Sequence, residues 1–167
     1  CALPIYGRPE PSLLVLVIVD QFAAHQFERW EPLMQGGLRA LSDRGAVYTQ
    51  ARYAYANTVT AAGHATATTG AWPAVHGIVA NRWYEEGTGR RTYCYSDPES
   101  GRSPRNLMAQ TLADGLVLAT SGRSKVVAVS LKDRAAIPMG GTRPTLSAWY
   151  DKTRGGFVAG AWKGATK

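Results

Sequence analysis

Residues 12–19 read Ser-Leu-Leu-Val-Leu-Val-Ile-Val, and Asp20 follows them directly. A continuous run rich in β-branched residues, without polar alternation, predicts a strand buried on both faces, as in parallel sheets. A second run of this kind, Ser-Lys-Val-Val-Ala-Val-Ser-Leu at residues 124–131, is followed by Lys132-Asp133-Arg134. Both runs therefore predict buried strands with charged residues at their carboxyl ends.

Segments with other patterns lie between and after these strands. Residues 32–41 have apolar side chains at helical spacing and are followed by Gly45, which suits a helix C-cap. Residues 60–69 have mostly small side chains, which predict a tightly packed helix that Gly70 stops. The other predicted elements are a helix over residues 106–119, a short strand over 46–49, a polar hairpin or surface excursion over 87–104, and one or two short strands around 157–162.

The order of these elements predicts the fold class. Strands alternate with helices along the chain, which favours an α/β fold with a mostly parallel central sheet flanked by helices. In such sheets, ligands bind beyond the carboxyl ends of the strands. Because Asp20 and the segment Lys132-Asp133-Arg134 each follow a predicted strand, we expect them to belong to one site.

Composition and charge limit the function classes. The chain has 167 residues, of which 45% are hydrophobic and 19% charged, as in a globular protein that buries a core. The longest apolar run, residues 13–19, is much shorter than the roughly 20 residues of a membrane-spanning helix. A net charge of +7 favours anionic partners such as phosphate esters. The basic residues are scattered, however, so we expect no nucleic-acid partner. The shortness of the longest apolar run predicts no transmembrane segment.

The two cysteines, Cys1 and Cys94, are too few for a disulfide framework, although one bridge could form. A chain that opens with Cys1 and shows no signal peptide is consistent with a processed, lipid-anchored terminus, or with a fragment boundary. Cys94 has no second cysteine nearby in the sequence, which argues against a zinc site there.

Asp20 and Thr60 each have two interpretations. Asp20 could cap a helix or form a turn, or it could be a rigidly held carboxylate that binds a metal ion or acts as a general base. Thr60 could be a helix N-cap. It could also be a nucleophile, because the N–H groups and the positive dipole end at a helix N-terminus favour both a phosphoryl group and a threonine alkoxide. His64 is predicted to be a buried hydrogen-bonding residue rather than a metal ligand.

Lys132 and Arg134 are separated by one residue, so in an extended segment their side chains would point the same way. Together they could contact the outer oxygens of one phosphate, with arginine as a planar fork and lysine as a point charge. Asn81 is ambiguous on its own, because an asparagine after Val79-Ala80 could simply form a turn.

Five segments of the chain carry a family resemblance when they are taken together. They read Val-Ile-Val-Asp-Gln-Phe at residues 17–22, Ala-Asn-Thr-Val-Thr-Ala-Ala-Gly-His-Ala-Thr at 56–66, Thr-Gly-Ala-Trp-Pro-Ala-Val-His-Gly-Ile-Val-Ala-Asn at 69–81, Ser-Pro-Arg-Asn-Leu at 103–107, and Ser-Leu-Lys-Asp-Arg-Ala-Ala at 130–136. In this order they resemble the PafA-type bacterial alkaline phosphatases, within the superfamily that also holds nucleotide pyrophosphatases/phosphodiesterases. The resemblance implies that residues 1–167 are the amino-terminal segment of a single alkaline-phosphatase-like catalytic domain, with a surface excursion near residues 85–105.

The resemblance also implies a role for each candidate residue. Thr60 would be the nucleophile and would form a phosphothreonine, which water then hydrolyses. Asp20 and Thr60 would bind a site of two Zn²⁺ ions, most of whose ligands lie outside this chain. Asn81, Lys132 and Arg134 would contact the oxygens of the transferred phosphoryl group.

The implied activity is hydrolysis of phosphate monoesters, because a monoester dianion has one more charge and one more free oxygen than a diester and so suits two cations. The alternatives are a phosphodiesterase or nucleotide pyrophosphatase of the same superfamily, and a non-catalytic phosphate-binding remnant. The implied partners are small phosphate esters and the remainder of the enzyme chain. The implied location is periplasmic or secreted.

Overall fold

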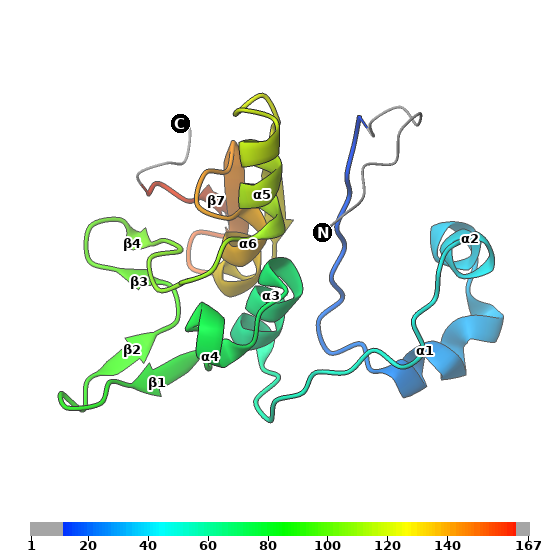
Figure 1. The fold of residues 1–167 in the computed structure, drawn as a ribbon, viewed down its shortest axis with the longest axis horizontal. Coiled ribbons are helices and arrows are strands. Elements are labelled where there is room, and N and C mark those ends of the chain that lie inside the picture. Colours follow the sequence, from blue (N-terminus) through cyan, green and yellow to red (C-terminus); the bar gives the residue numbers. More distant parts are fainter. Residues whose placement is uncertain (1–11, 163–167) are drawn as a thin grey trace. The chain divides into compact units, whose positions relative to one another are not determined.

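A computed structural model describes residues 12–162 of the chain. The chain falls into two compact units, Cys1–Thr49 and Gln50–Lys167, and each is described by itself (Figure 1). All strands in the described residues belong to the second unit. The lipid anchor predicted at Cys1 lies outside the described residues.

The first unit contains short helices. These are α1 (Ala24–Trp30), the 3-10 turn η1 (Glu31–Leu33) and α2 (Gly36–Arg44). The helix predicted over residues 32–41 begins later, because Met34 after η1 is extended, with φ −66° and ψ 138°. It ends at Arg44, and the Gly45 N–H donates to the Leu41 carbonyl over 2.8 Å, so the predicted C-cap is confirmed.

The strand predicted over residues 12–19 is wrong for the described structure. Residues 13–19 carry no secondary structure, and their side chains are largely exposed, with Leu13 at 76% and Val17 at 74%. The short strand predicted over 46–49 is also absent from the described residues. A strand exists through hydrogen bonds to a neighbour, and an apolar pattern cannot supply that neighbour.

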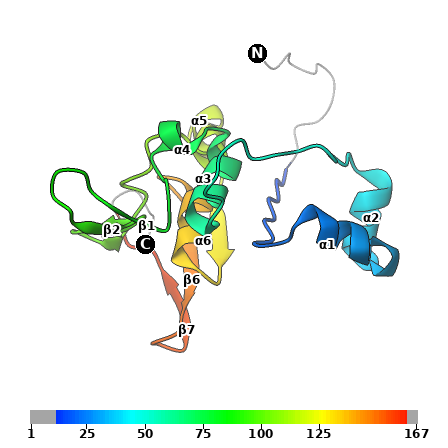
Figure 2. The same ribbon diagram turned by 90° about the horizontal axis from the view of Figure 1, so that it is seen from below.

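The second unit is built around a three-stranded sheet of β5 (Val127–Ser130), β6 (Leu146–Asp151) and β7 (Gly156–Ala159), in that order. β5 and β6 are parallel, with Val129 opposite Ala148, and β6 and β7 form an antiparallel hairpin (Figure 2). Helix α6 (Asp133–Gly140) connects the parallel pair. The α/β class is confirmed, and the described sheet combines parallel and antiparallel pairing.

The strand predicted over residues 124–131 forms as β5, but it is not buried on both faces. Ala128 is buried against α6, whereas Val127 and Val129 are 62% and 55% exposed. An extended segment after β5 would turn Lys132 and Arg134 to the same side, but only Lys132 is extended, as the N-cap of α6 with φ −134° and ψ 136°, and Arg134 lies in the first helical turn. Pro138 inside α6 obscured this helix in the sequence.

Helix α3 (Thr60–Thr69) has the bounds that the sequence predicts, and Gly70 ends it in the left-handed conformation, with φ 67°. Ala61, Ala62 and Ala65 are fully buried, because small side chains let α3 pack closely on α6. The short helix α4 (Pro73–His76) follows and also contacts α3.

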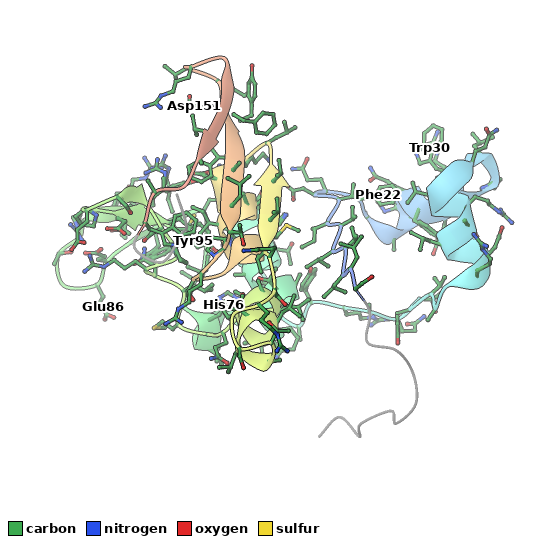
Figure 3. The ribbon with its side chains drawn as sticks, turned by 90° about the horizontal axis from the view of Figure 1, so that it is seen from above. Phe22, Trp30, His76, Glu86, Tyr95 and Asp151 are labelled. Atoms are coloured by element: carbon green, nitrogen blue, oxygen red, sulfur yellow. The ribbon has the colours of Figure 1, made fainter. Side chains whose placement is uncertain are left out.

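The segment predicted as a hairpin or surface excursion forms two hairpins. β1 (Arg82–Tyr84) pairs with β2 (Arg91–Tyr93), and β3 (Ser96–Asp97) pairs with β4 (Gly101–Arg102). Cys94 and Tyr95, which connect the two hairpins, are buried in the core, and Tyr95 is labelled in Figure 3. The buried core cluster consists of Ala61, Ala65, Ile78, Tyr93, Cys94, Tyr95, Leu107, Ile137 and Trp162.

Helix α5 (Leu112–Ala119) begins later than the predicted residue 106, because Thr111 and Asp114 form a capping box. The Asp114 carboxylate also accepts from the Thr142 N–H over 2.7 Å and from the Thr142 hydroxyl over 2.6 Å. Gly141 has φ +70°, and a Cβ there would collide with Thr111 and Asp114. Asp114 therefore joins the start of α5 to the chain that leaves α6.

No helix within residues 12–162 is long and apolar enough to cross a membrane.

Replacing Asp114 with alanine is expected to lower the free energy of unfolding by about 2–4 kcal/mol, since a charged capping box and two hydrogen bonds to Thr142 are lost. Burial raises the pKa of Asp114, but hydrogen bonds from Thr142 and Thr111 outweigh burial and hold the pKa below its usual value. The stabilisation is therefore present above the usual aspartate pKa and is lost as the pH falls through the lower folded value.

Urea unfolding at pH 7 and in acid measures both effects. The matched control is Glu99→Ala, which removes an exposed carboxylate of the same unit and is expected to change the unfolding free energy by less than about 0.5 kcal/mol. Equal effects of the two substitutions at pH 7 would contradict the role assigned to Asp114.

Candidate active site

Thr60 is the first residue of α3, and it is only 8% exposed. The helix N-cap is Val59, with φ −66° and ψ 162°, so the alternative interpretation of Thr60 as the N-cap is wrong. The Thr60 carbonyl lies 2.8 Å from Nδ1 of the buried His64. His64 is therefore a buried hydrogen-bonding residue, as the sequence predicts.

Asn81 contacts the same helix end from outside α3. Its Oδ1 accepts a hydrogen bond from the Ala61 N–H over 2.9 Å, which places the Asn81 side chain beside Thr60. Because Oδ1 accepts in this contact, the hydrogen-bond donors of the Asn81 side chain are the two N–H bonds of Nδ2. The Asn81 carbonyl accepts from the N–H of Cys94, the residue that follows β2, over 3.2 Å. Asn81 is thus more than a turn residue.

Lys132 and Arg134 lie at the amino end of α6, which packs against α3 (Figures 1 and 2). The positive end of the α6 dipole adds to their two charges. The Arg134 Nε is buried and has no hydrogen-bond partner within residues 12–162. Burial lowers the pKa of Arg134, but interactions with Tyr93 and Asp133 outweigh it, so the net pKa lies above the usual value.

Asp133, between these two cations, is the centre of a polar network that the sequence did not predict. Its Oδ1 accepts from the Tyr93 hydroxyl over 2.6 Å and from the Arg134 N–H over 2.7 Å. Its Oδ2 accepts from Arg102 Nε over 2.8 Å. Burial, followed by the hydrogen bond to Asp133, raises the pKa of Tyr93, so this phenol stays protonated and donates.

The same network connects the two helix ends. Tyr93 pairs with Arg82 across the β1–β2 hairpin, one residue from Asn81, and Asn81 binds the start of α3. In the second unit, this chain of contacts links the start of α3, with Thr60 and Asn81, to the start of α6, with Lys132 and Arg134. No spacing in the sequence pairs Tyr93 with Asp133, because 40 residues separate them.

Asp20 belongs to the first unit. It is exposed at a turn, in which the Val19 carbonyl accepts from the Phe22 N–H over 3.4 Å. The four candidate residues of the second unit therefore do not include the predicted carboxylate ligand.

The described residues do not form a complete metal site. Residues 12–162 contain no group of three or more His, Cys, Asp and Glu side chains arranged to hold a metal ion. The buried His76, like His64, makes hydrogen bonds within the protein. Its Nδ1 accepts from the Ile78 N–H over 3.1 Å, and its Nε2 lies 3.0 Å from the Thr66 hydroxyl. Burial raises the pKa of the Cys94 thiol to about 12, which keeps it protonated at neutral pH.

Sequence comparisons identify relatives of the chain. Residues 14–164 match a family model described as type I phosphodiesterase / nucleotide pyrophosphatase. The chain is 38% identical to alkaline phosphatase PafA of Elizabethkingia meningoseptica, over 92% of this chain and 30% of that protein. It is 36% identical to alkaline phosphatase PhoV of Synechococcus elongatus, over 89% of this chain and 29% of that protein. The chain thus spans less than a third of the length of these relatives.

Structural comparison agrees with the sequences. The crystal structure of wild-type PafA gives a TM-score of 0.60 at 46% identity, over 62% of this chain and 22% of that one. A PafA variant gives the same TM-score at 42% identity, with the same coverage of both chains, and its four substitutions replace a threonine, an asparagine, a lysine and an arginine. The match to the family model covers most of the chain, so the chain belongs to the type I phosphodiesterase / nucleotide pyrophosphatase family.

Proposed function

We propose that this chain is part of a phosphate-ester hydrolase that acts on phosphate monoesters, with Thr60 as its nucleophile. One observation carries the proposal: Asn81 binds the N-terminus of α3 beside the buried Thr60, and α6, which begins with Lys132 as its N-cap and Arg134 in its first turn, packs against α3. Helix N-termini, an amide donor and two cations suit an anionic phosphoryl group.

The proposed reaction has two displacements. The Thr60 oxygen attacks phosphorus while the ester oxygen leaves, which gives an alcohol and a phosphothreonine. Water then attacks the phosphothreonine and releases inorganic phosphate and Thr60. Phosphoryl transfer depends mainly on positioning and charge stabilisation, which is the task of the residues around Thr60.

Asn81, Lys132 and Arg134 would hold the non-bridging oxygens of the transferred phosphoryl group. Asn81 Nδ2 would donate to one oxygen, and the two cations would contact the others. A monoester dianion offers one more charged oxygen than a diester, so a pair of cations favours the monoester. The guanidinium of Arg134 adds a planar fork that suits phosphate oxygens.

The metal requirement is part of the proposal. Asp20 and Thr60 offer oxygen ligands of the type that zinc accepts, and the remaining ligands of the proposed two-zinc site would come from outside residues 1–167. Two such ions, when bound, stabilise the attacking and leaving oxygens. Residues 12–162 do not complete a metal site, so the roles above are assigned to protein groups only.

The relatives support the proposal. Both PafA and PhoV are named as alkaline phosphatases. The four residue types replaced in the PafA variant are those of Thr60, Asn81, Lys132 and Arg134, with the same spacing within the Thr/Asn pair and within the Lys/Arg pair. The description of the family model favours a second candidate, a phosphodiesterase or nucleotide pyrophosphatase at the same site. We also propose a periplasmic or secreted location.

Thr60→Ala in the full-length enzyme is expected to lower kcat for a monoester by about 10³-fold or more, because the nucleophile is removed. Thr60→Ser keeps a hydroxyl and is expected to retain measurable turnover and a covalent intermediate. Steady-state kinetics and intact-mass detection of a phosphorylated protein in acid-quenched samples measure these results. Unchanged turnover in Thr60→Ala would refute the assignment of the nucleophile.

The Lys132→Ala/Arg134→Ala double variant is expected to lower monoester kcat/KM by about 10²- to 10³-fold, since two charge-assisted contacts are lost. Diester kcat/KM is expected to fall by less than about tenfold, because a diester lacks one of the contacted charges. The comparison uses a matched aryl phosphate monoester and diester.

The control is Arg123→Ala/Lys125→Ala, which removes two exposed cations with the same spacing. It is expected to leave both activities unchanged. Equal losses for monoester and diester in the Lys132/Arg134 variant would favour the phosphodiesterase candidate. Phosphate binding without turnover of either ester would favour a non-catalytic remnant.

A further inference from the structure

The carboxylate of Asp133 presents an electrostatic problem at the candidate site. It lies between Lys132 and Arg134, where a negative charge would offset the two cations that attract a phosphate. The side chain of Asp133 is only 14% exposed, and Arg102 forms an ion pair with it over 2.8 Å. Arg102, in β4, therefore neutralises the charge of the Asp133 carboxylate. The charges of Lys132 and Arg134 then remain available to attract a phosphate.

Tyr93 occupies the other side of this carboxylate. Its hydroxyl donates to Asp133 Oδ1 over 2.6 Å, and the same oxygen accepts from the Arg134 N–H, so one atom holds both groups. The guanidinium groups of Arg82 and Arg102 lie over the Tyr93 ring, 4.8 Å and 4.6 Å from its centroid. These cation–π contacts and its burial, at 9% exposed, fix the ring in place.

The backbone around Tyr93 leads to the other half of the site. Arg82 is the cross-strand partner of Tyr93, and Cys94 donates to the Asn81 carbonyl. The Tyr93 hydroxyl therefore links the strand pair next to Asn81 to the first turn of α6.

We propose that Tyr93 is a positioning residue of the candidate active site. Through its hydrogen bond to Asp133 it holds the start of α6, which carries Lys132 and Arg134, in a fixed position relative to Asn81. This inference rests on the proposed phosphatase function and adds a determinant of monoester preference to it. Tyr93 itself touches no substrate atom in this scheme. Its hydroxyl acts only by fixing the direction of the two cations.

The chain offers a matched control two residues away. Tyr95 is fully buried, like Tyr93 it lies in the core cluster, and its hydroxyl has no hydrogen-bond partner within residues 12–162. Tyr95→Phe removes the same atom as Tyr93→Phe from a similar environment, without removing a hydrogen bond. The pair therefore separates the loss of the Asp133 contact from the general effect of changing a buried tyrosine.

The experiment uses the full-length enzyme, with an aryl phosphate monoester and a matched diester. Tyr93→Phe is expected to lower monoester kcat/KM by about 10- to 100-fold, because small displacements of positioning groups have effects of this order, and to lower diester kcat/KM by less than about threefold. The inhibition constant of inorganic phosphate is expected to rise in Tyr93→Phe. Tyr95→Phe is expected to stay within about twofold of the parent enzyme in every measurement.

A double-mutant cycle tests the route of the effect. If Tyr93 acts through Lys132 and Arg134, then adding Tyr93→Phe to the Lys132→Ala/Arg134→Ala variant should cost less than about twofold in monoester kcat/KM, because the groups to be positioned are already absent. Full additivity, equal losses for monoester and diester, or equal behaviour of Tyr93→Phe and Tyr95→Phe would each overturn the inference while the parent enzyme remains an active phosphatase. A parent enzyme without monoesterase activity would instead overturn the proposed function, and the inference with it.

Discussion

The close packing of α3 on α6 is the constraint on which the candidate site depends, because each helix begins with residues of that site. Ala61, Ala62 and Ala65 of α3 are fully buried, and Ile137 of α6 lies in the same core cluster as Ala61 and Ala65. The distance between packed helices depends on the side chains at their contact. Larger residues on α3 would therefore move Thr60 away from Lys132 and Arg134 without touching any of the three.

The sequence correctly predicted helix bounds that depend on residues close together in the chain. The small residues of α3 and the glycines Gly45 and Gly70 define helix bounds through steric and capping effects within a few residues. Residues 12–19 were predicted as a strand from their apolar character, but a strand requires a hydrogen-bonded partner that the pattern does not contain. Helix α6 was missed for a different reason, because Pro138 lowers the helix propensity of a segment that is stabilised by tertiary packing.

The candidate site was predictable to the extent that its residues lie in short motifs. Thr60, Asn81, Lys132 and Arg134 were identified from such motifs. The structure places Asn81 at the start of α3, where Thr60 lies, and Lys132 and Arg134 at the start of α6. Tyr93 and Arg102 were not identifiable, since they reach Asp133 across 40 and 31 residues of chain. The position of a buried side chain between charged groups depends on the whole fold. Sequence motifs therefore identify residues that contact a ligand more readily than residues that orient them.

The exposed segment of residues 13–19 has a consequence for the handling of this chain. It combines high β-propensity with the absence of charge, proline and glycine, and six of its seven side chains are between 40% and 76% exposed. Short segments of this composition stack into cross-β fibrils when identical copies meet, because every backbone group finds a partner in the next copy. Preparations of residues 1–167 alone should therefore form thioflavin-positive aggregates as the protein concentration rises, and a charged residue introduced at position 15 or 17 should delay them.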